Sequence, residues 1–384
     1  MNTKRKITWI GWILSVFTGI VPAADSNRYI NVYVGTYMRT AEKGIFKFRL
    51  QLDSGELSGG ELAGKTINPS FLSLHPNGQL LYAVSEVSNF NGTKSGAVSA
   101  FAVNKETEKL TLLNQQSSGG GGPCHLIVDA AGKNLLVADY GGGSVEVVPI
   151  LSDGKLKEPS CVILHKDPEA GAEPRQSHCH SINLDASQKY AFVADLGLDR
   201  VFFYKFDAEK GILTKNEPEA LVLAKGAGPR HLAWHTSGKF AYIINELNST
   251  ITVTAFDSEK GTLSEVQTLS TLPEGFSGKS DCAEVVVHPS GRFLYGSNRG
   301  HDSIAIFAID EATGKLKALG YEPTQGKTPR NFCIDPSGQY LLAANQDSNN
   351  IVVFRIDSST GLLKPTGQKA KVSAPTCVKF SPKE

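Results

Sequence analysis

Residues 282–299 read CAEVVVHPSGRFLYGSNR, and this stretch decides the fold of the chain. An apolar run leads into the tetrad HPSG at 288–291, and a second apolar run follows it. Proline fixes φ and glycine permits a positive φ, so the tetrad predicts a tight turn between two antiparallel strands. The alternating run SIAIFAI at 303–309 predicts a third strand, and TGKL at 313–316 predicts a turn into a fourth.

The same unit recurs along the chain, and a fixed internal period decides architecture before any single motif is interpreted. Copies of its first two strands begin at Asn68, Gly122, His178, Gly228, Cys282 and Thr328. The spacing of roughly 50 residues lies in the range of propeller blades. Helical periodicity is essentially absent from these units, so the sequence predicts an all-β chain.

The two ends of the chain complement each other. Residues 29–34 resemble a second strand that lacks its first, and residues 374–382 resemble a first strand that lacks its second. Pairing them makes a closed ring without an exposed edge, which an open solenoid would not require. We therefore predict a single domain, a seven-bladed β-propeller of four-stranded antiparallel blades that is closed by its N- and C-terminal strands.

The N-terminus has the layout of a secretory signal peptide. Three basic residues at 4–6 precede an apolar run at 7–21, and Ala23 and Ala24 follow Pro22. We expect residues 1–24 to be a signal peptide and residues 25–384 to be the exported propeller, periplasmic or extracellular. An uncleaved membrane anchor is the alternative. No other segment is apolar enough to cross a bilayer, so no membrane contact is expected after cleavage.

Charge and cysteine usage narrow the partners. The formal charge of the whole chain is +1, and removal of the three basic residues at 4–6 changes it to −2, so no nucleic-acid partner is expected. The six cysteines lack the close spacing of a stapled module or a zinc site. Five of them fall on the recurring first strand, which favours buried free thiols over disulfides. We expect a monomer without a cofactor.

The repeat also predicts a polar mouth on the axis. The first strand of each blade lines the axis of a propeller, so its start and the end of the second strand lie at one mouth. These two positions bring together three residues of each of three types, Arg230, Arg299 and Arg330, Glu86, Glu246 and Glu284, and His125, His180 and His231. Packing alone does not select such residues, and clustered titratable groups are typical of a site. A plug of mutually neutralising Arg and Glu is the alternative.

Other histidines and glycines favour simpler interpretations. His75, His235 and His288 occupy the turn of their repeats and are expected to be structural. His178 and His180, two apart on a strand, could bind a metal, but no third ligand is evident at useful spacing, so no metal site is expected. The runs at 119–122 and 141–143 are loops between strands, because neither glycine run leads into a helix that could bind phosphate.

Several strings resemble the lactonase family of seven-bladed propellers, which includes bacterial propeller-type 6-phosphogluconolactonases and a fungal carboxy-cis,cis-muconate cyclase. They are GPRH at 228–231, NEL at 245–247, HCHS at 178–181, SNRGHDS at 297–303 and TPRN at 328–331. The resemblance covers nearly all of the mature chain. It implies the fold strongly and the substrate weakly.

The resemblance implies a catalytic set of His180, Arg230, Glu246 and Arg299, which the polar mouth also contains. In our hypothesis Glu246, or His180 beside it, takes a proton from the attacking water. Arg230 and Arg299 stabilise the oxyanion and bind the negative group of the substrate. The candidate substrate-binding residues are His125, His178, His231, Glu284 and Arg330.

Three functions are compatible with this site. The first is hydrolysis of a sugar lactone, so that the ligand is a small lactone or an anionic sugar acid. Export favours free sugar lactones, because phosphorylated sugars are scarce outside the cytoplasm. The second is a cyclase of muconate type, in which the same arginines hold carboxylates. The third is a non-catalytic propeller that binds a ligand or protein at its mouth.

Overall fold

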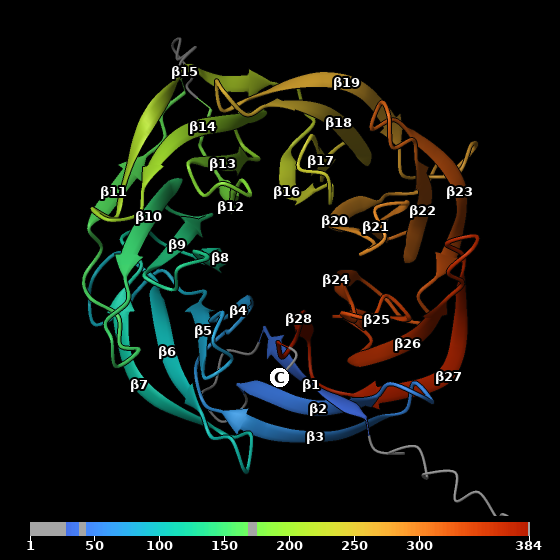
Figure 1. Ribbon diagram of the computed structural model, residues 1–384, viewed down its shortest axis with the longest axis horizontal. Coiled ribbons are helices and arrows are strands. Elements are labelled where there is room, and N and C mark those ends of the chain that lie inside the picture. The colour runs from blue at the N-terminus through green and yellow to red at the C-terminus, as the bar shows by residue number, and fades with distance from the viewer. Residues whose placement is uncertain (1–27, 38–43, 168–174, 383–384) are drawn as a thin grey trace, which may run out of the picture.

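The computed structural model describes residues 28–37, 44–167 and 175–382. These residues form seven four-stranded sheets arranged as blades around a central axis (Figure 1). The prediction of an all-β, seven-bladed propeller is confirmed. The expected signal peptide, residues 1–24, lies outside the described part of the chain. Within the described ranges, no helix is long and apolar enough to cross a membrane.

Each blade contributes one strand to each of four concentric positions. The innermost strands are β4 (Leu72–Leu74), β8 (Pro123–Val128), β12 (Cys179–Leu184), β16 (Pro229–Trp234), β20 (Asp281–Val287), β24 (Pro329–Ile334) and β28 (Pro375–Phe380). The second strands are β1 (Tyr29–Thr36), β5 (Leu80–Ser85), β9 (Asn134–Asp139), β13 (Tyr190–Asp195), β17 (Phe240–Asn245), β21 (Phe293–Arg299) and β25 (Tyr340–Asn345). The third strands are β2 (Ile45–Gln51), β6 (Ala97–Val103), β10 (Ser144–Pro149), β14 (Arg200–Asp207), β18 (Thr250–Asp257), β22 (Ser303–Ile309) and β26 (Asn350–Ile356). The outermost strands are β3 (Leu57–Gly64), β7 (Leu110–Ser117), β11 (Cys161–Leu164), β15 (Ile212–Val222), β19 (Thr262–Ser270), β23 (Leu316–Pro323) and β27 (Leu363–Lys371).

The ring closes as the sequence predicts. Blade 1 has the strand order β28-β1-β2-β3, and blades 2 to 7 follow in chain order from β4 to β27. Strand β28 pairs antiparallel with β1, from Val32 opposite Phe380 to Thr36 opposite Pro375. The two ends of the chain therefore share one sheet, and Figure 1 shows β28 on the axis with the other innermost strands.

The core lies between neighbouring blades, where the second and third strands pack face to face. Their side chains are largely buried, whereas the outermost strands alternate between buried and exposed residues. Buried tyrosines join several neighbouring blades: Tyr242 donates to the Gly314 carbonyl at 3.1 Å, and Tyr295 donates to that of Gly361 at 2.8 Å. A Cβ on Gly361 would lie 2.5 Å from the Phe293 ring, so this close approach requires glycine.

The histidines of the first turn also join blades, which confirms their structural interpretation. Nε2 of His235 lies 2.9 Å from the carbonyl oxygen of Gly291, and Nε2 of His288 lies 2.9 Å from that of Gly338. His75 makes the same contact with Gly132 at 3.1 Å. These three contacts therefore link turns of neighbouring blades on the face opposite the predicted mouth.

All six cysteines are unpaired. Five lie on innermost strands, as the repeat predicts, and the sixth, Cys161, begins β11. Burial raises the pKa of Cys282 and of Cys377 to about 12, so these thiols stay protonated and inert at neutral pH.

Candidate functional site

The two positions that predict the mouth lie at one end of the ring. The backbone N–H after the second strand donates to the carbonyl that precedes the innermost strand, from Glu246 to Gly228 at 2.7 Å and from Gln346 to Thr328 at 2.9 Å. Tyr140 makes the equivalent bond to Gly122 at 2.9 Å. The end of each second strand therefore lies beside the start of its innermost strand.

A β-bulge at the start of the innermost strands aims the site residues. In β16, Pro229 pairs with Asn245 and His231 with Ile244, so Arg230 is an extra residue without a partner across the ladder. The same shift leaves Cys124, His180 and Arg330 as extra residues in β8, β12 and β24. Bulges interrupt the alternation of side chains between the two faces of a strand. Two consecutive residues, such as Arg230 and His231, can therefore point toward the axis together.

Glu246 is the centre of the four residues that were predicted to be catalytic. Its Oε2 lies 2.8 Å from Nε of Arg230, and its Oε1 lies 3.0 Å from Nη2 of Arg299. His180 places Nε2 4.0 Å from Oε2 of the same carboxylate. The structure thus brings His180, Arg230, Glu246 and Arg299 together from three blades.

The charges of this group follow from burial and pairing. Burial alone would raise the pKa of Glu246, but Arg230 and Arg299 lower it below its ordinary value, so the carboxylate is ionised. Burial, and next the positive charge of Arg230, lowers the pKa of His180 well below 6.5. The mouth therefore holds a permanent carboxylate beside a neutral imidazole.

Arg230 is turned toward the protein more than toward the opening. It is 2% exposed, and burial lowers its pKa to about 10. Its Nη1 donates to the Ala283 carbonyl at 2.8 Å and lies 3.2 Å from Nε2 of His231. Arg299 is less enclosed, and its Nη2 also donates to the Cys282 carbonyl at 2.8 Å.

His231 and Glu284 form a buried layer behind Arg230. Nδ1 of His231 lies 2.9 Å from Oε1 of Glu284, and Asn331 donates to the other oxygen of that carboxylate. The Asn331 Oδ1 accepts from the backbone of Val378 at 2.8 Å, which ties this layer to the closing strand β28. These contacts occupy His231 and Glu284, which were expected to bind substrate.

The remaining predicted binding residues lie around this centre. The His178 ring stacks on Tyr140 with ring centroids 4.3 Å apart, and Tyr140 also contacts the edge of the His180 ring. His125 lies deeper, with its ring 5.3 Å from that of His231.

Arg330 is half-buried and lies 5.9 Å from the Tyr37 ring centroid. Within the described ranges no carboxylate pairs with Arg330. Its positive charge acts on Glu246, where it helps to lower the pKa of the carboxyl group. Arg330 is therefore a cation of the mouth that is available to a ligand.

Sequence reasoning placed Tyr140 at the mouth but did not select it as a site residue, and it missed Lys379. Lys379 lies two residues beyond the predicted register on β28, and its Nζ is 4.6 Å from the centre of the Phe71 ring. Burial raises the pKa of Glu284, but His231 and then the charge of Lys379 lower it, and the net shift is downward. Side chains two residues apart on a strand point to the same side, so counting two residues on from Cys377 would have identified Lys379.

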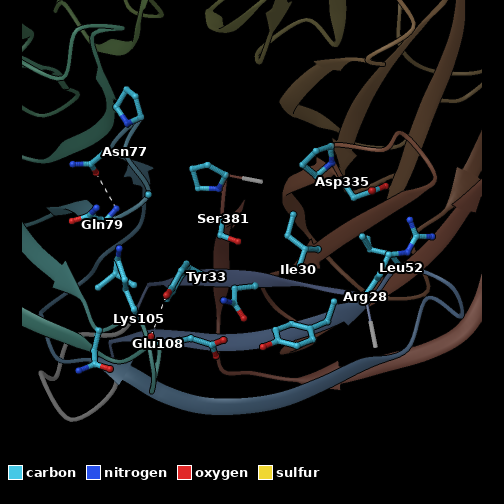
Figure 2. A pocket seen from close by; sticks show the side chains of 18 of the residues that line it. Arg28, Ile30, Tyr33, Leu52, Asn77, Gln79, Lys105, Glu108, Asp335 and Ser381 are labelled. Atoms are coloured by element: carbon cyan, nitrogen blue, oxygen red, sulfur yellow. Dashed lines mark hydrogen bonds between the residues drawn. The ribbon is translucent and has the colours of Figure 1, made fainter. Parts of the chain in front are cut away.

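A cavity of about 820 Å³ opens at the other end of the ring (Figure 2). The turn residues Asn77, Gln79 and Asp335 line it, together with Tyr33 and Ser381. None of the predicted site residues lines this cavity. The cavity and the convergence of titratable groups therefore lie at opposite ends of the ring.

The chain is thus a seven-bladed propeller in which a carboxylate at the axial mouth lies between two arginines. The sequence matches the lactonase family of seven-bladed β-propellers over residues 31–380, and the chain belongs to this family. It is 34% identical over 308 residues to a 6-phosphogluconolactonase of Bacillus subtilis, which covers 80% of this chain and 85% of that protein. It is 36% identical over 313 residues to a 6-phosphogluconolactonase of Formosa agariphila, covering 79% and 86% of the two chains. The periplasmic gluconolactonase of Pseudomonas aeruginosa has a similar structure, with a TM-score of 0.85 and 31% identity over 92% of this chain and 99% of that one.

Proposed function

We propose that the protein hydrolyses the lactone of a sugar acid at the axial mouth, with His180, Arg230, Glu246 and Arg299 as the catalytic set. One observation carries the proposal, namely an ionised carboxylate held by two arginines 4.0 Å from a neutral imidazole. The lactonase family and the names of the relatives from Bacillus subtilis and Pseudomonas aeruginosa support lactone hydrolysis.

In this mechanism a water molecule attacks the lactone carbonyl beside His180. The neutral imidazole takes the proton of the water at Nε2, and the Glu246 carboxylate stabilises the imidazolium that forms. Arg299 and the remaining Nη2 donor of Arg230 stabilise the oxyanion of the tetrahedral intermediate. The imidazolium then returns its proton to the ring oxygen as the ester bond breaks, which leaves a hydroxy acid.

In this proposal Arg330 binds the acid product. Its guanidinium is half-buried and faces the mouth without a carboxylate partner in the described ranges, so it can pair with the new carboxylate of the product. We propose a free sugar lactone as substrate, because residues 1–24 are proposed to export residues 25–384 as the mature chain. The structural similarity to a periplasmic gluconolactonase supports this choice.

The test is to follow acid release by residues 25–384 from glucono-δ-lactone and from its 6-phosphate, relative to the spontaneous rate. We expect acceleration with glucono-δ-lactone. Turnover of a carboxymuconate without hydrolysis of either lactone would identify the cyclase instead. Binding of gluconate without turnover of any of these compounds would identify a non-catalytic propeller.

A further inference from the structure

Behind the mouth, where blade 3 leads into blade 4, lies a buried group of three potential metal ligands. His165 follows β11, Cys179 begins β12 and Asp195 ends β13. The His165 and Asp195 side chains are 2% and 0% exposed, and Cys179 is fully buried. Nδ1 of His165 lies 2.9 Å from Oδ2 of Asp195 and 3.3 Å from Sγ of Cys179, and Sγ lies 3.8 Å from Oδ2.

The propeller repeat shows what the positions of His165 and Asp195 contain in the other blades. The His165 N–H donates to the Gly143 carbonyl, and the residues that make the equivalent bond in other blades are Ser118, Leu223, Thr271, Thr324 and Val372. Asp195 corresponds to residues at the ends of the other second strands, namely Thr36, Ser85, Asp139, Asn245, Asn298 and Asn345. Within the described ranges, the junction of blades 3 and 4 alone combines an imidazole, a thiol and a carboxylate at these positions.

Blade 6 shows that the fold itself does not need this combination. There Thr271 lies 3.1 Å from Sγ of Cys282, and Oγ1 of Thr271 donates to Oδ1 of Asn298 at 2.7 Å. A hydroxyl, a thiol and an amide therefore join the three equivalent strands, β19, β20 and β21, by neutral hydrogen bonds. At the junction of blades 3 and 4, an imidazole replaces the hydroxyl and a carboxylate replaces the amide, while the thiol is retained. Imidazole, thiolate and carboxylate are the donor types that zinc prefers.

We propose that His165, Cys179 and Asp195 bind a divalent transition-metal ion of the zinc type. Bond lengths of about 2.0–2.3 Å place the donors of a tetrahedral zinc site about 3.3–3.6 Å apart, and the three distances at this junction bracket this range. On binding, the Cys179 thiol releases its proton to solvent, and the proton that Nδ1 of His165 donates to Asp195 moves to Nε2, so that Nδ1 is free to ligate. One dication, one thiolate and one carboxylate then sum to zero charge, which suits a buried site.

The groups around the three ligands support the same assignment. Oη of Tyr204 lies 2.8 Å from Nε2 of His165, so it can accept the proton that ligation through Nδ1 leaves on Nε2. Oδ1 of Asp195 accepts from the backbone of His178 at 2.9 Å and of Leu198 at 3.1 Å, which orients the ligating oxygen. Ser177 Oγ, 2.5 Å from Oδ2 of Asp195, marks the side on which a fourth ligand would lie.

The ion would brace the strand start that carries His178 and His180 into the mouth. The same side chains also satisfy one another by hydrogen bonds, as their counterparts in blade 6 do, so the experiment must separate an ion site from a hydrogen-bonded clamp. Because the ligands are buried, the ion must enter during folding. Its detection does not depend on lactonase activity, and failure of one proposal leaves the other standing.

The test is to refold residues 25–384 with cobalt(II), remove loosely held metal by dialysis against chelator, and record the thiolate-to-cobalt charge-transfer band together with the metal content. We expect one ion per chain and a band that Cys179→Ser abolishes but Cys282→Ser retains. The double variant His165→Thr with Asp195→Asn, which copies blade 6, should fold with native far-ultraviolet circular dichroism and retain no ion. A folded wild-type chain without the band, or a band unchanged in Cys179→Ser, would overturn the proposal.

Discussion

Nη1 of Arg230 lies 3.2 Å from Nε2 of His231, and this contact determines the proton position on the imidazole. A guanidinium can only donate, so Nε2 accepts and the proton of a neutral His231 lies on Nδ1. Nδ1 then donates to Glu284, 2.9 Å away. Burial is the main cause that lowers the pKa of His231, which keeps this tautomer neutral. A continuous chain of contacts thus runs from Glu284 through His231 and Arg230 to Glu246.

His231 should accordingly act by positioning Arg230. We expect His231→Ala to lower kcat by about 10- to 100-fold and to leave KM nearly unchanged, because small displacements of a catalytic group are costly. Steady-state kinetics on glucono-δ-lactone measure both constants. A raised KM at unchanged kcat would instead support the original expectation that His231 contacts the substrate.

Arg330 should govern affinity for anions. Loss of a charge-assisted hydrogen bond costs about 1.5–3 kcal/mol, so Arg330→Gln should weaken inhibition by gluconate by about 10- to 100-fold. Competitive inhibition constants for gluconate measure the effect. Arg292→Gln is the control, because Arg292 lies in the turn before β21, at the opposite end of the strands. Equal inhibition of wild type and Arg330→Gln would contradict the role of Arg330.

The pH profile should be flat into the acid range. The mechanism needs a neutral His180 and an ionised Glu246, and the pKa of each group is lowered. Acidification therefore leaves both groups in their active forms until the pH falls well below 6.5, the ordinary value for histidine. We expect kcat/KM, corrected for spontaneous hydrolysis, to stay level from about pH 8 to below that value. A midpoint at 6.5 or higher would contradict the assignment of His180.

Ring closure should dominate stability. Val378 on β28 is 1% exposed and packs in the core cluster that contains Val34 and Tyr340. We expect Val378→Ala to lower the free energy of unfolding by about 2 kcal/mol, from lost burial and the cavity left behind. Urea titration measures this change. Leu362→Ala is the control and should have little effect, because Leu362 is 44% exposed. A Val378→Ala variant as stable as wild type would contradict a stabilising role of the closing strand β28.

The sequence predicts the ring and the location of the mouth because both follow from periodicity. The copies of one strand-turn-strand unit give the blades, and the complementary ends at 29–34 and 374–382 give the closure that β1 and β28 show. Counting from each turn then finds Arg230, Glu246, Arg299 and His180 without any knowledge of their contacts. The place of a residue within a repeat is a property of the sequence, so it can be recognised without the structure.

The roles within the mouth depend on local irregularities that periodicity does not contain. The bulge at Arg230 turns two consecutive residues toward the axis, and as a result His231 lies behind Arg230 and bonds to Glu284. The His165, Cys179 and Asp195 group escapes a search by spacing, because its members come from the ends of three strands in adjacent blades. His178 and His180, the pair that spacing does suggest, gather around Tyr140 instead.

The most direct test of the account is the hydrolysis of glucono-δ-lactone by Glu246→Gln. This variant keeps the shape of the side chain but removes the charge that holds Arg230, Arg299 and the imidazolium of His180, so we expect kcat/KM to fall by about 10²- to 10⁴-fold with an unchanged melting profile. The control is Glu86→Gln, whose kcat/KM should fall much less. Glu86 occupies the same position in blade 2, and its carboxylate accepts from Ser70. Wild-type turnover by a folded Glu246→Gln variant would show that the chemistry does not take place at this carboxylate.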